Sequence, residues 1–248
     1  MSKFLIQASW EDVPHLSEEA KAALRASYPE YQRDARTKGI PQLGAGAIYP
    51  VPESEILIDP FDIPPYWPRG YGLDVGWNRT AAVFGAVDRE TTPATIYLYS
   101  EHYRGHAEPS VHAAAIHNRG AWMRGAIDPA ARGRGQKDGD QLWQSYMDLG
   151  LHIVKAINAR EAGIFEVWQA LSQGRLKVFR TLQAWLAEYR LYRRDEHGEI
   201  VKENDHLMDA TRYLVMTLEQ IAGVDPNYLS KMGHNPGVVS EYDPFANA

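Results

Sequence analysis

The sequence predicts an α/β protein in which helices flank a mixed sheet, and three observations carry this prediction. Three strand-like runs come first, at residues 71–75, 80–87 and 94–103. Helical and strand-like runs then alternate from residue 108 to residue 192. Such alternation is typical of parallel strands joined by helices, whereas strands joined by a short turn pair antiparallel. A hydrophobic content of 44% with 23% charged residues is ordinary for a globular chain of 248 residues.

Residues 1–69 are expected to form a linker-like segment with one helix. A serine and two glutamates open an alanine-rich run at residues 17–28, which is typical of a helix start. Glycines and prolines dominate the remainder, with six prolines between Pro50 and Pro68. Proline lacks the backbone donor that helices and central strands need, so this stretch is predicted to be extended and wrapping rather than part of a core.

Residues 70–222 are expected to form the domain itself. The run at residues 80–87 is almost wholly apolar, which is typical of a central strand covered on both faces. A turn at residues 88–93 joins it to the next strand, and we expect this hairpin at one side of the sheet. The later elements follow in order: helix 108–118, strand 124–127, helix 140–149, strand 152–157, helix 160–173, strand 176–179 and helix 181–192.

The C-terminal part is predicted to contain a polar hairpin, a last helix and a tail. Residues 193–203 are polar and resemble a hairpin. Thr181 is predicted to cap the helix that precedes this hairpin, and Asn204 the helix that ends at Ile221. Residues 223–248 contain three prolines without periodicity and are expected to be loosely held.

Composition excludes several kinds of protein. The chain has no cysteine, which removes disulfides, thiolate chemistry and cysteine-ligated zinc. No apolar run reaches the roughly eighteen residues of a membrane span, and the N-terminus lacks the pattern of a signal peptide. A net charge of −6 argues against a protein that coats nucleic acid by bulk attraction. It is compatible with a nuclease whose carboxylates hold metal ions.

Four aspartates stand where a carboxylate needs an explanation. Asp74 lies in a strand-like apolar run, where burying a lone carboxylate is costly unless a cation or hydrogen bonds compensate it. Asp128 follows another strand, while Asp205 and Asp209 are four residues apart and share one face of the last helix. Magnesium and manganese prefer oxygen ligands, so carboxylates that converge from separate elements predict a divalent-metal site.

Each aspartate also has an interpretation without a metal. Asp128 is followed by a proline and could simply begin a turn. Asp205 could cap the last helix, and Asp209 could pair with Arg212 on a solvated face. Asp74 is the hardest to explain in this way, because its apolar neighbours place it inside a strand.

Three segments together resemble a known family. They are residues 72–82 (GLDVGWNRTAA), 126–130 (AIDPA) and 204–213 (NDHLMDATRY). They resemble the acidic motifs of the nuclease domain of the large terminase subunit of tailed bacteriophages, and the resemblance covers about residues 70–220. It implies a ribonuclease H-like fold. Asp74, Asp128 and Asp209 match the metal-binding aspartates of that family, and Asp205 matches a less uniform acidic position.

The resemblance also implies an activity. It implies a DNA endonuclease with two divalent cations, Mg²⁺ or Mn²⁺, in which Asp74 bridges both ions. Asp128 and Asp209 would each complete one coordination sphere, with Asp205 assisting. The implied reaction is hydrolysis of double-stranded DNA with little sequence preference, when concatemers are cut during viral genome packaging in the host cell cytoplasm.

The N-terminal segment resembles the connection between the ATPase and nuclease domains of a terminase, in residues 8–17, 33–41 and 46–50. The chain has no Gly-x4-Gly-Lys-Ser/Thr phosphate-binding loop, so we expect no ATP hydrolysis from it. The partners implied by the resemblance are double-stranded DNA, the terminase ATPase domain, the small terminase subunit and the portal. No membrane is among them.

Basic and aromatic residues near the acidic motifs are candidates for DNA contact. Arg132, Arg134 and Lys137 alternate with glycines directly after Asp128, and this loop could grip a phosphate backbone or be a solvated surface loop. Trp77 lies beside the first acidic motif and could touch substrate. His112, by contrast, is expected at the surface.

Two other functions stay open at this point. A resolvase-like or RNA-cleaving enzyme would keep the fold and the acidic site but act on another substrate. A non-catalytic packaging-assembly module would use the proline-rich segment and the tail to bind partners, and it need not bind metal at all.

Overall fold

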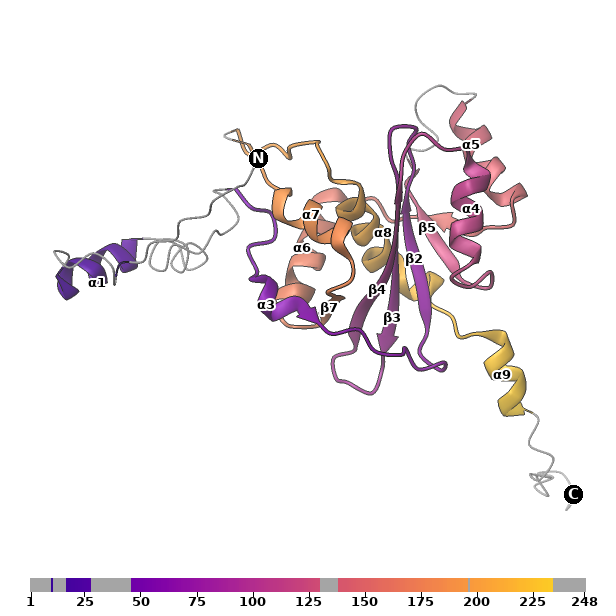
Figure 1. Ribbon diagram of the computed structural model, residues 1–248, viewed down its shortest axis with the longest axis horizontal. Coiled ribbons are helices and arrows are strands. Elements are labelled where there is room, and N and C mark those ends of the chain that lie inside the picture. Colours follow the sequence, from indigo (N-terminus) through magenta and orange to yellow (C-terminus); the bar gives the residue numbers. More distant parts are fainter. Residues whose placement is uncertain (1–9, 11–16, 28–45, 130–137, 196, 234–248) are drawn as a thin grey trace, which may run out of the picture.

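The computed structural model describes residue 10 and residues 17–27, 46–129, 138–195 and 197–233. Within these residues, helices flank a mixed seven-stranded sheet, which confirms the predicted fold class (Figure 1). The strands are β1 (Leu57–Ile58), β2 (Arg69–Asp74), β3 (Thr80–Asp88), β4 (Thr95–Arg104), β5 (Arg124–Ile127), β6 (His152–Lys155) and β7 (Leu176–Phe179).

The antiparallel strands occupy the middle of the sheet, so the prediction of a hairpin at one side is wrong. The strand order is β1-β7-β4-β3-β2-β5-β6. β3 pairs antiparallel with both β2 and β4, while β5 and β7 add to the outer edges of this unit in the parallel direction. All nine residues of β3 are therefore buried, as its apolar sequence predicted.

Helices cover both faces of the sheet. The described helices are α1 (Glu18–Ser27), α3 (Glu53–Ile56), α4 (Pro109–His117), α5 (Asp138–Asp148), α6 (Arg160–Ser172), α7 (Gln183–Leu191), α8 (His206–Ile221) and α9 (Pro226–Gly233). In Figure 1, α6, α7 and α8 lie on one side of the sheet, and α4 and α5 on the other. None of these helices is long and apolar enough to cross a membrane.

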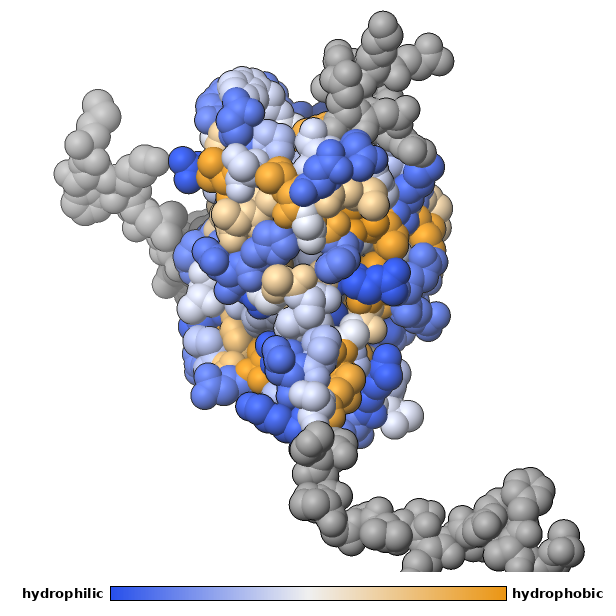
Figure 2. All heavy atoms as spheres, turned by 90° about the vertical axis from the view of Figure 1, so that its right-hand side faces the viewer, coloured by the Kyte–Doolittle hydropathy of each residue, from blue (hydrophilic) through white to orange (hydrophobic). Residues whose placement is uncertain are grey.

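A separate hydrophobic core fills each side. α8 packs on β2, β3 and β5, and its Leu207 and Leu214 are fully buried, as the helical pattern predicted. Beneath α4 and α5, Tyr71, Phe84 and Ile116 belong to the second core. Figure 2 shows this second side from outside, where hydrophilic and hydrophobic side chains alternate over the surface.

Residues 46–69 belong to the packed domain, which moves its boundary ahead of the expected residue 70. Tyr49, Val51 and Ile56 are buried in the core beside α7, and the Tyr189 hydroxyl donates to the carbonyl of Val51 at 2.7 Å. β1 pairs with β7 at the edge of the sheet. The apolar residues near its prolines therefore enter the core, which the expectation of an extended segment outside the core did not include.

Predictions for the two ends of the chain differ in outcome. Ser17 caps α1, because its hydroxyl accepts a hydrogen bond from the amide of Ala20 at 3.2 Å. The predicted polar hairpin is present, with a bridge between Arg194 and Ile200. Within the tail that was expected to be loosely held, residues 226–233 form α9, which stands apart from the sheet in Figure 1.

Two further local predictions are wrong because tertiary contacts decide them. Thr181 does not cap α7. The Glu101 carboxylate of β4 does so instead, accepting from the amides of Ala184 and Trp185 at 3.0 and 2.8 Å. His112 is only 2% exposed, and its ring bonds that of His102 across 2.8 Å.

Candidate metal centre

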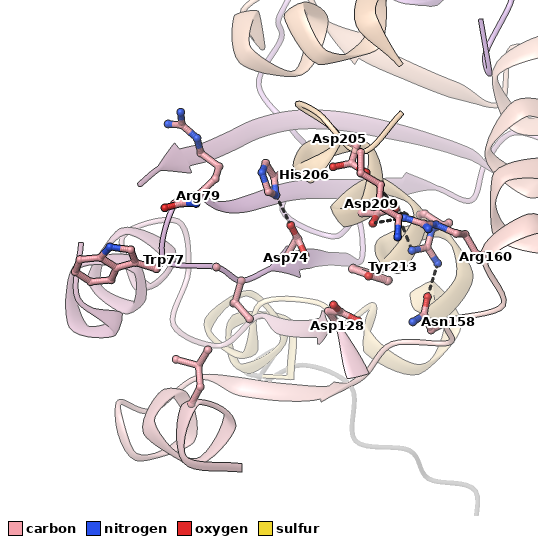
Figure 3. A pocket seen from close by; sticks show the side chains of 16 residues that line it. Asp74, Trp77, Arg79, Asp128, Asn158, Arg160, Asp205, His206, Asp209 and Tyr213 are labelled. Atoms are coloured by element: carbon pink, nitrogen blue, oxygen red, sulfur yellow. Dashed lines mark hydrogen bonds and ion pairs between the residues drawn. The ribbon is translucent and has the colours of Figure 1, made fainter. Parts of the chain in front are cut away.

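The four aspartates that the sequence predicted as metal ligands, Asp74, Asp128, Asp205 and Asp209, line one cavity. It opens where β2 and β5 end and α8 begins (Figure 3). β2 and β5 are parallel neighbours, so residues at their C-terminal ends meet at the same edge of the sheet. The amide of Asp128 donates to the carbonyl of Leu73 at 3.2 Å, which fixes the chain after β5 beside the end of β2. The sheet register therefore places Asp74 and Asp128 on the same cavity.

Asp74 is the last residue of β2 rather than a residue in its middle. Its side chain is 14% exposed, and Nδ1 of His206 lies 2.8 Å from its Oδ2. Burial raises the pKa of the Asp74 carboxyl, and the hydrogen bond with His206 opposes this rise. The same hydrogen bond raises the pKa of His206. The hydrogen bond with His206 therefore offsets part of the free-energy cost of burying the Asp74 carboxylate.

Asp205 and Asp209 enter the cavity from the start of α8. Asp205 is the N-cap residue, and its carbonyl accepts from the amide of Asp209 at 2.8 Å. Burial raises the pKa of the Asp205 carboxyl, and the nearby charge of Asp209 raises it further. The positive end of the helix dipole favours carboxylates at this position.

Two arginines face Asp209 from different sides. Nε and one terminal nitrogen of Arg212 lie 3.3 and 3.1 Å from Oδ1 of Asp209. A terminal nitrogen of Arg160 lies 3.6 Å from Oδ2 of Asp209 and 3.9 Å from Oδ2 of Asp205. The predicted pairing of Asp209 with Arg212 is therefore present, but on a buried face, and it does not keep Asp209 out of the cavity.

Glu188 positions the start of α8, and no sequence pattern predicted this role. Its side chain is buried, and its Oε2 accepts from the amide of Leu207 at 2.5 Å. Asn204 was predicted to cap this helix, but the N-cap is Asp205, which makes no side-chain capping bond. The acceptor comes from α7, so no local motif around residue 204 could reveal it.

The rim of the cavity carries an exposed aromatic side chain on a fixed turn. Trp77 is 63% exposed, and its carbonyl accepts from the amide of His106 at 2.9 Å. Arg79 follows it, with its guanidinium carbon 4.3 Å from the centroid of the Tyr103 ring. Both Trp77 and Arg79 line the cavity, as does Lys202. The basic loop with Arg132, Arg134 and Lys137 lies outside the described residues.

The donor set suits a hard divalent cation. The four carboxylates come from three separate elements, and carboxylate oxygens are the ligands that Mg²⁺ and Mn²⁺ prefer. Among the described residues, no three acidic or histidine side chains form a ready group around one point. Asp74 instead bonds His206, as Figure 3 shows, and Asp209 bonds Arg212. Ion binding would therefore require side-chain rearrangement.

Comparison with known proteins places the chain in a family. The model of the terminase RNaseH-like domain matches residues 71–218. The large terminase subunit of Enterobacteria phage LP7 is 34% identical over 231 residues, and the match covers 88% of this chain and 48% of that protein. That of Salmonella phage P22 is 34% identical over 223 residues, and the match covers 86% of this chain and 44% of that protein. The chain thus spans about half the length of the curated relatives it matches.

Solved structures agree with the sequence comparison. The P22 large terminase nuclease domain superposes with a TM-score of 0.67 at 30% identity, covering 74% of this chain and 97% of that domain. The nuclease domain of the bacteriophage SPP1 large terminase gives 0.51 at 18% identity, covering 69% and 99%, and shows likeness of fold alone. By the family match and these relatives, the chain belongs to the ribonuclease H-like domain family of phage large terminases.

Proposed function

We propose that the chain is a metal-dependent endonuclease that hydrolyses double-stranded DNA with little sequence preference. The observation that carries this proposal is the meeting of four aspartates from β2, the end of β5 and the start of α8 in one cavity. Family membership supports it, because the matched P22 structure is a nuclease domain. The related SPP1 domain was crystallised with bound manganese, which supports a divalent cation here.

Asp74, Asp128 and Asp209 are the proposed catalytic and metal-binding residues, and Asp205 assists them. Bound Mg²⁺ or Mn²⁺, two ions in the proposed arrangement, would activate water and stabilise charge on phosphate. The chain itself keeps the carboxylates in place. His206 donates to Asp74, and the buried Arg212 holds one oxygen of Asp209, which leaves its other oxygen toward the cavity.

DNA would enter over the rim that carries Trp77, Arg79 and Lys202. Cationic side chains bind phosphate without reading base sequence, which accounts for the proposed low sequence preference. Arg132 and its basic neighbours in the loop after Asp128 are proposed to extend this contact along the backbone. The exposed indole of Trp77 adds a face that can pack against a sugar or a base.

The biological setting is part of the proposal. The chain matches only part of each large terminase subunit, so the cutting of concatemers during genome packaging in the host cytoplasm is inferred for the whole assembly. Its proposed partners are DNA, the terminase ATPase domain, the small subunit and the portal. No ATPase activity is proposed for this chain.

The test is cleavage of supercoiled plasmid in Mn²⁺ by single variants. Asp74→Asn, Asp128→Asn and Asp209→Asn should each abolish cleavage while the circular dichroism spectrum stays unchanged. Asp148→Asn is the matched control, because Asp148 is exposed on α5 and does not line the cavity. Full activity of any one of the three would remove that residue from the mechanism.

Parallel substrates separate the alternatives. Faster cleavage of four-way junctions or RNA–DNA hybrids than of duplex DNA would favour a resolvase-like or RNA-cleaving enzyme. Absence of both Mn²⁺ binding in calorimetry and cleavage of every substrate would favour a non-catalytic assembly module.

A further inference from the structure

We propose that Arg160 competes with a divalent cation for Asp205 and Asp209, and that a DNA phosphate draws Arg160 away when substrate binds. This inference rests on the proposed nuclease function and adds a coupling between metal binding and DNA binding. It assigns to Arg160, the first residue of α6, a role at the site beyond that of the four aspartates.

The geometry at Asp209 shows what an incoming ion would meet. Its Oδ1 is held by Arg212, whereas its Oδ2 faces Arg160 at 3.6 Å. The same guanidinium lies 3.9 Å from Oδ2 of Asp205. An ion that binds these two cavity-facing oxygens would lie against Arg160, and two cations at such a distance repel each other. Arg160 must therefore move before such an ion can bind.

Arg212, unlike Arg160, cannot move away from Asp209 to admit an ion. It is 1% exposed, donates to Oδ1 of Asn158 at 2.8 Å and lies over the ring of Tyr213 at 4.6 Å. It also passes directly over Gly163, where an added Cβ would lie 2.6 Å from its Cγ. Arg212 is thus a fixed part of the site, and it orients Asp209 without blocking Oδ2.

Arg160, in contrast, is partly exposed and only loosely held. Its side chain is 36% exposed, and its distances of 3.6 and 3.9 Å to the two carboxylates exceed hydrogen-bond length. The two carboxylates are only 13% and 14% exposed, but the guanidinium of Arg160 makes no hydrogen bond to either and stays in contact with water, so it can exchange partners. A guanidinium also matches the geometry of a phosphate, so the cavity offers Arg160 an alternative partner as soon as DNA enters.

The charges that line the cavity support a coupling between metal binding and DNA binding. Among the described lining residues, four aspartates face four arginine or lysine side chains, namely Arg79, Arg160, Lys202 and Arg212. His206 also lines the cavity and can carry positive charge. Each divalent ion adds two positive charges to this set, while each DNA phosphate adds one negative charge. Metal and DNA therefore favour each other's binding, and this coupling is reciprocal.

The test is Mn²⁺ binding by isothermal titration calorimetry, without DNA, for the wild type and Arg160→Gln. We expect Arg160→Gln to bind Mn²⁺ about five- to tenfold more tightly, which corresponds to about 1–1.4 kcal/mol. Arg160→Lys keeps the charge and should stay close to the wild type. Arg180→Gln is the control for loss of an exposed ion-paired arginine, since Arg180 pairs with Asp59 and does not line the cavity.

The second arm is metal-free binding of a short DNA duplex, measured by fluorescence anisotropy. Arg160→Gln should weaken it, and Arg180→Gln should not. Equal or weaker Mn²⁺ affinity in Arg160→Gln, or unchanged duplex binding, overturns the inference and leaves the nuclease proposal standing. Absence of Mn²⁺ binding in the wild type and in every variant overturns the nuclease proposal itself, and the inference with it.

Discussion

Replacing Gly72 by alanine is expected to push the helix that carries Asp209 away from the strand that carries Asp74. Gly72 lies on β2 under the backbone of α8. A Cβ at this position would lie 1.8 Å from the carbonyl oxygen of Ala210 and 2.9 Å from the amide nitrogen of Leu214. The closest contacts of real Cβ atoms are 3.0–3.4 Å, so α8 has to move by about 1.2–1.6 Å to accept the methyl group.

The magnitude follows from what the new methyl group meets. The obstacle is the helix backbone, which cannot turn aside as a flexible side chain can. Overpacking of a core costs about 1–3 kcal/mol, and we expect Gly72→Ala to lie near the upper end. A misplacement of about 1 Å in a catalytic site can lower the rate about 100-fold. The variant should therefore lose cleavage more severely than it loses stability.

Urea denaturation and Mn²⁺-dependent plasmid cleavage test this expectation together. The matched control is Gly223→Ala, because an added Cβ at Gly223 meets nothing within 4 Å. It should behave as the wild type in both assays. If Gly72→Ala unfolds at the wild-type urea concentration and cleaves at the wild-type rate, then close contact between β2 and α8 does not set the geometry of the site.

Three further predictions concern the surroundings of the site. Glu188→Ala removes the acceptor of the Leu207 amide and should destabilise the protein by about 1–3 kcal/mol in urea denaturation; wild-type stability would show that Glu188 does not hold the start of α8. Trp77→Ala should weaken duplex binding without changing the melting temperature, and unchanged binding would remove the indole from the DNA contact. Burial and the neighbouring His112 lower the pKa of His102 from 6.5 to about 4. Because the unfolded chain takes up this proton first, the melting temperature should fall as pH drops from 6.5 towards 4. It should fall less steeply in His102→Gln, and equal slopes would contradict this cause.

The residues of the candidate site could be predicted because each follows from a local pattern. Asp74 interrupts an apolar strand-like run, Asp128 follows another, and Asp205 and Asp209 share one face of a helix start. The parallel pairing of β5 with β2, which brings Asp74 and Asp128 to one edge of the sheet, has no such local pattern. Sequence patterns could therefore single out the four carboxylates, whereas the fold brings them to one cavity.

The remaining features depend on contacts between residues far apart in the chain. The position of β3 at the centre is set by the pairing of β5 and β7 outside it, and no nearby residue signals either pairing. Glu101 and Glu188 cap helices to which they do not belong. Arg160 likewise comes from α6, and only the fold brings it to the carboxylates.

The most direct test of the proposed metal centre is an anomalous difference map from crystals grown with manganese. We predict manganese peaks in the cavity, in contact with Asp74, Asp128 and Asp209, with Arg160 turned away from Asp209. A crystal that holds manganese elsewhere but shows no peak among these carboxylates, with Asp74 still bound to His206 and Asp209 still facing both arginines, would contradict the account.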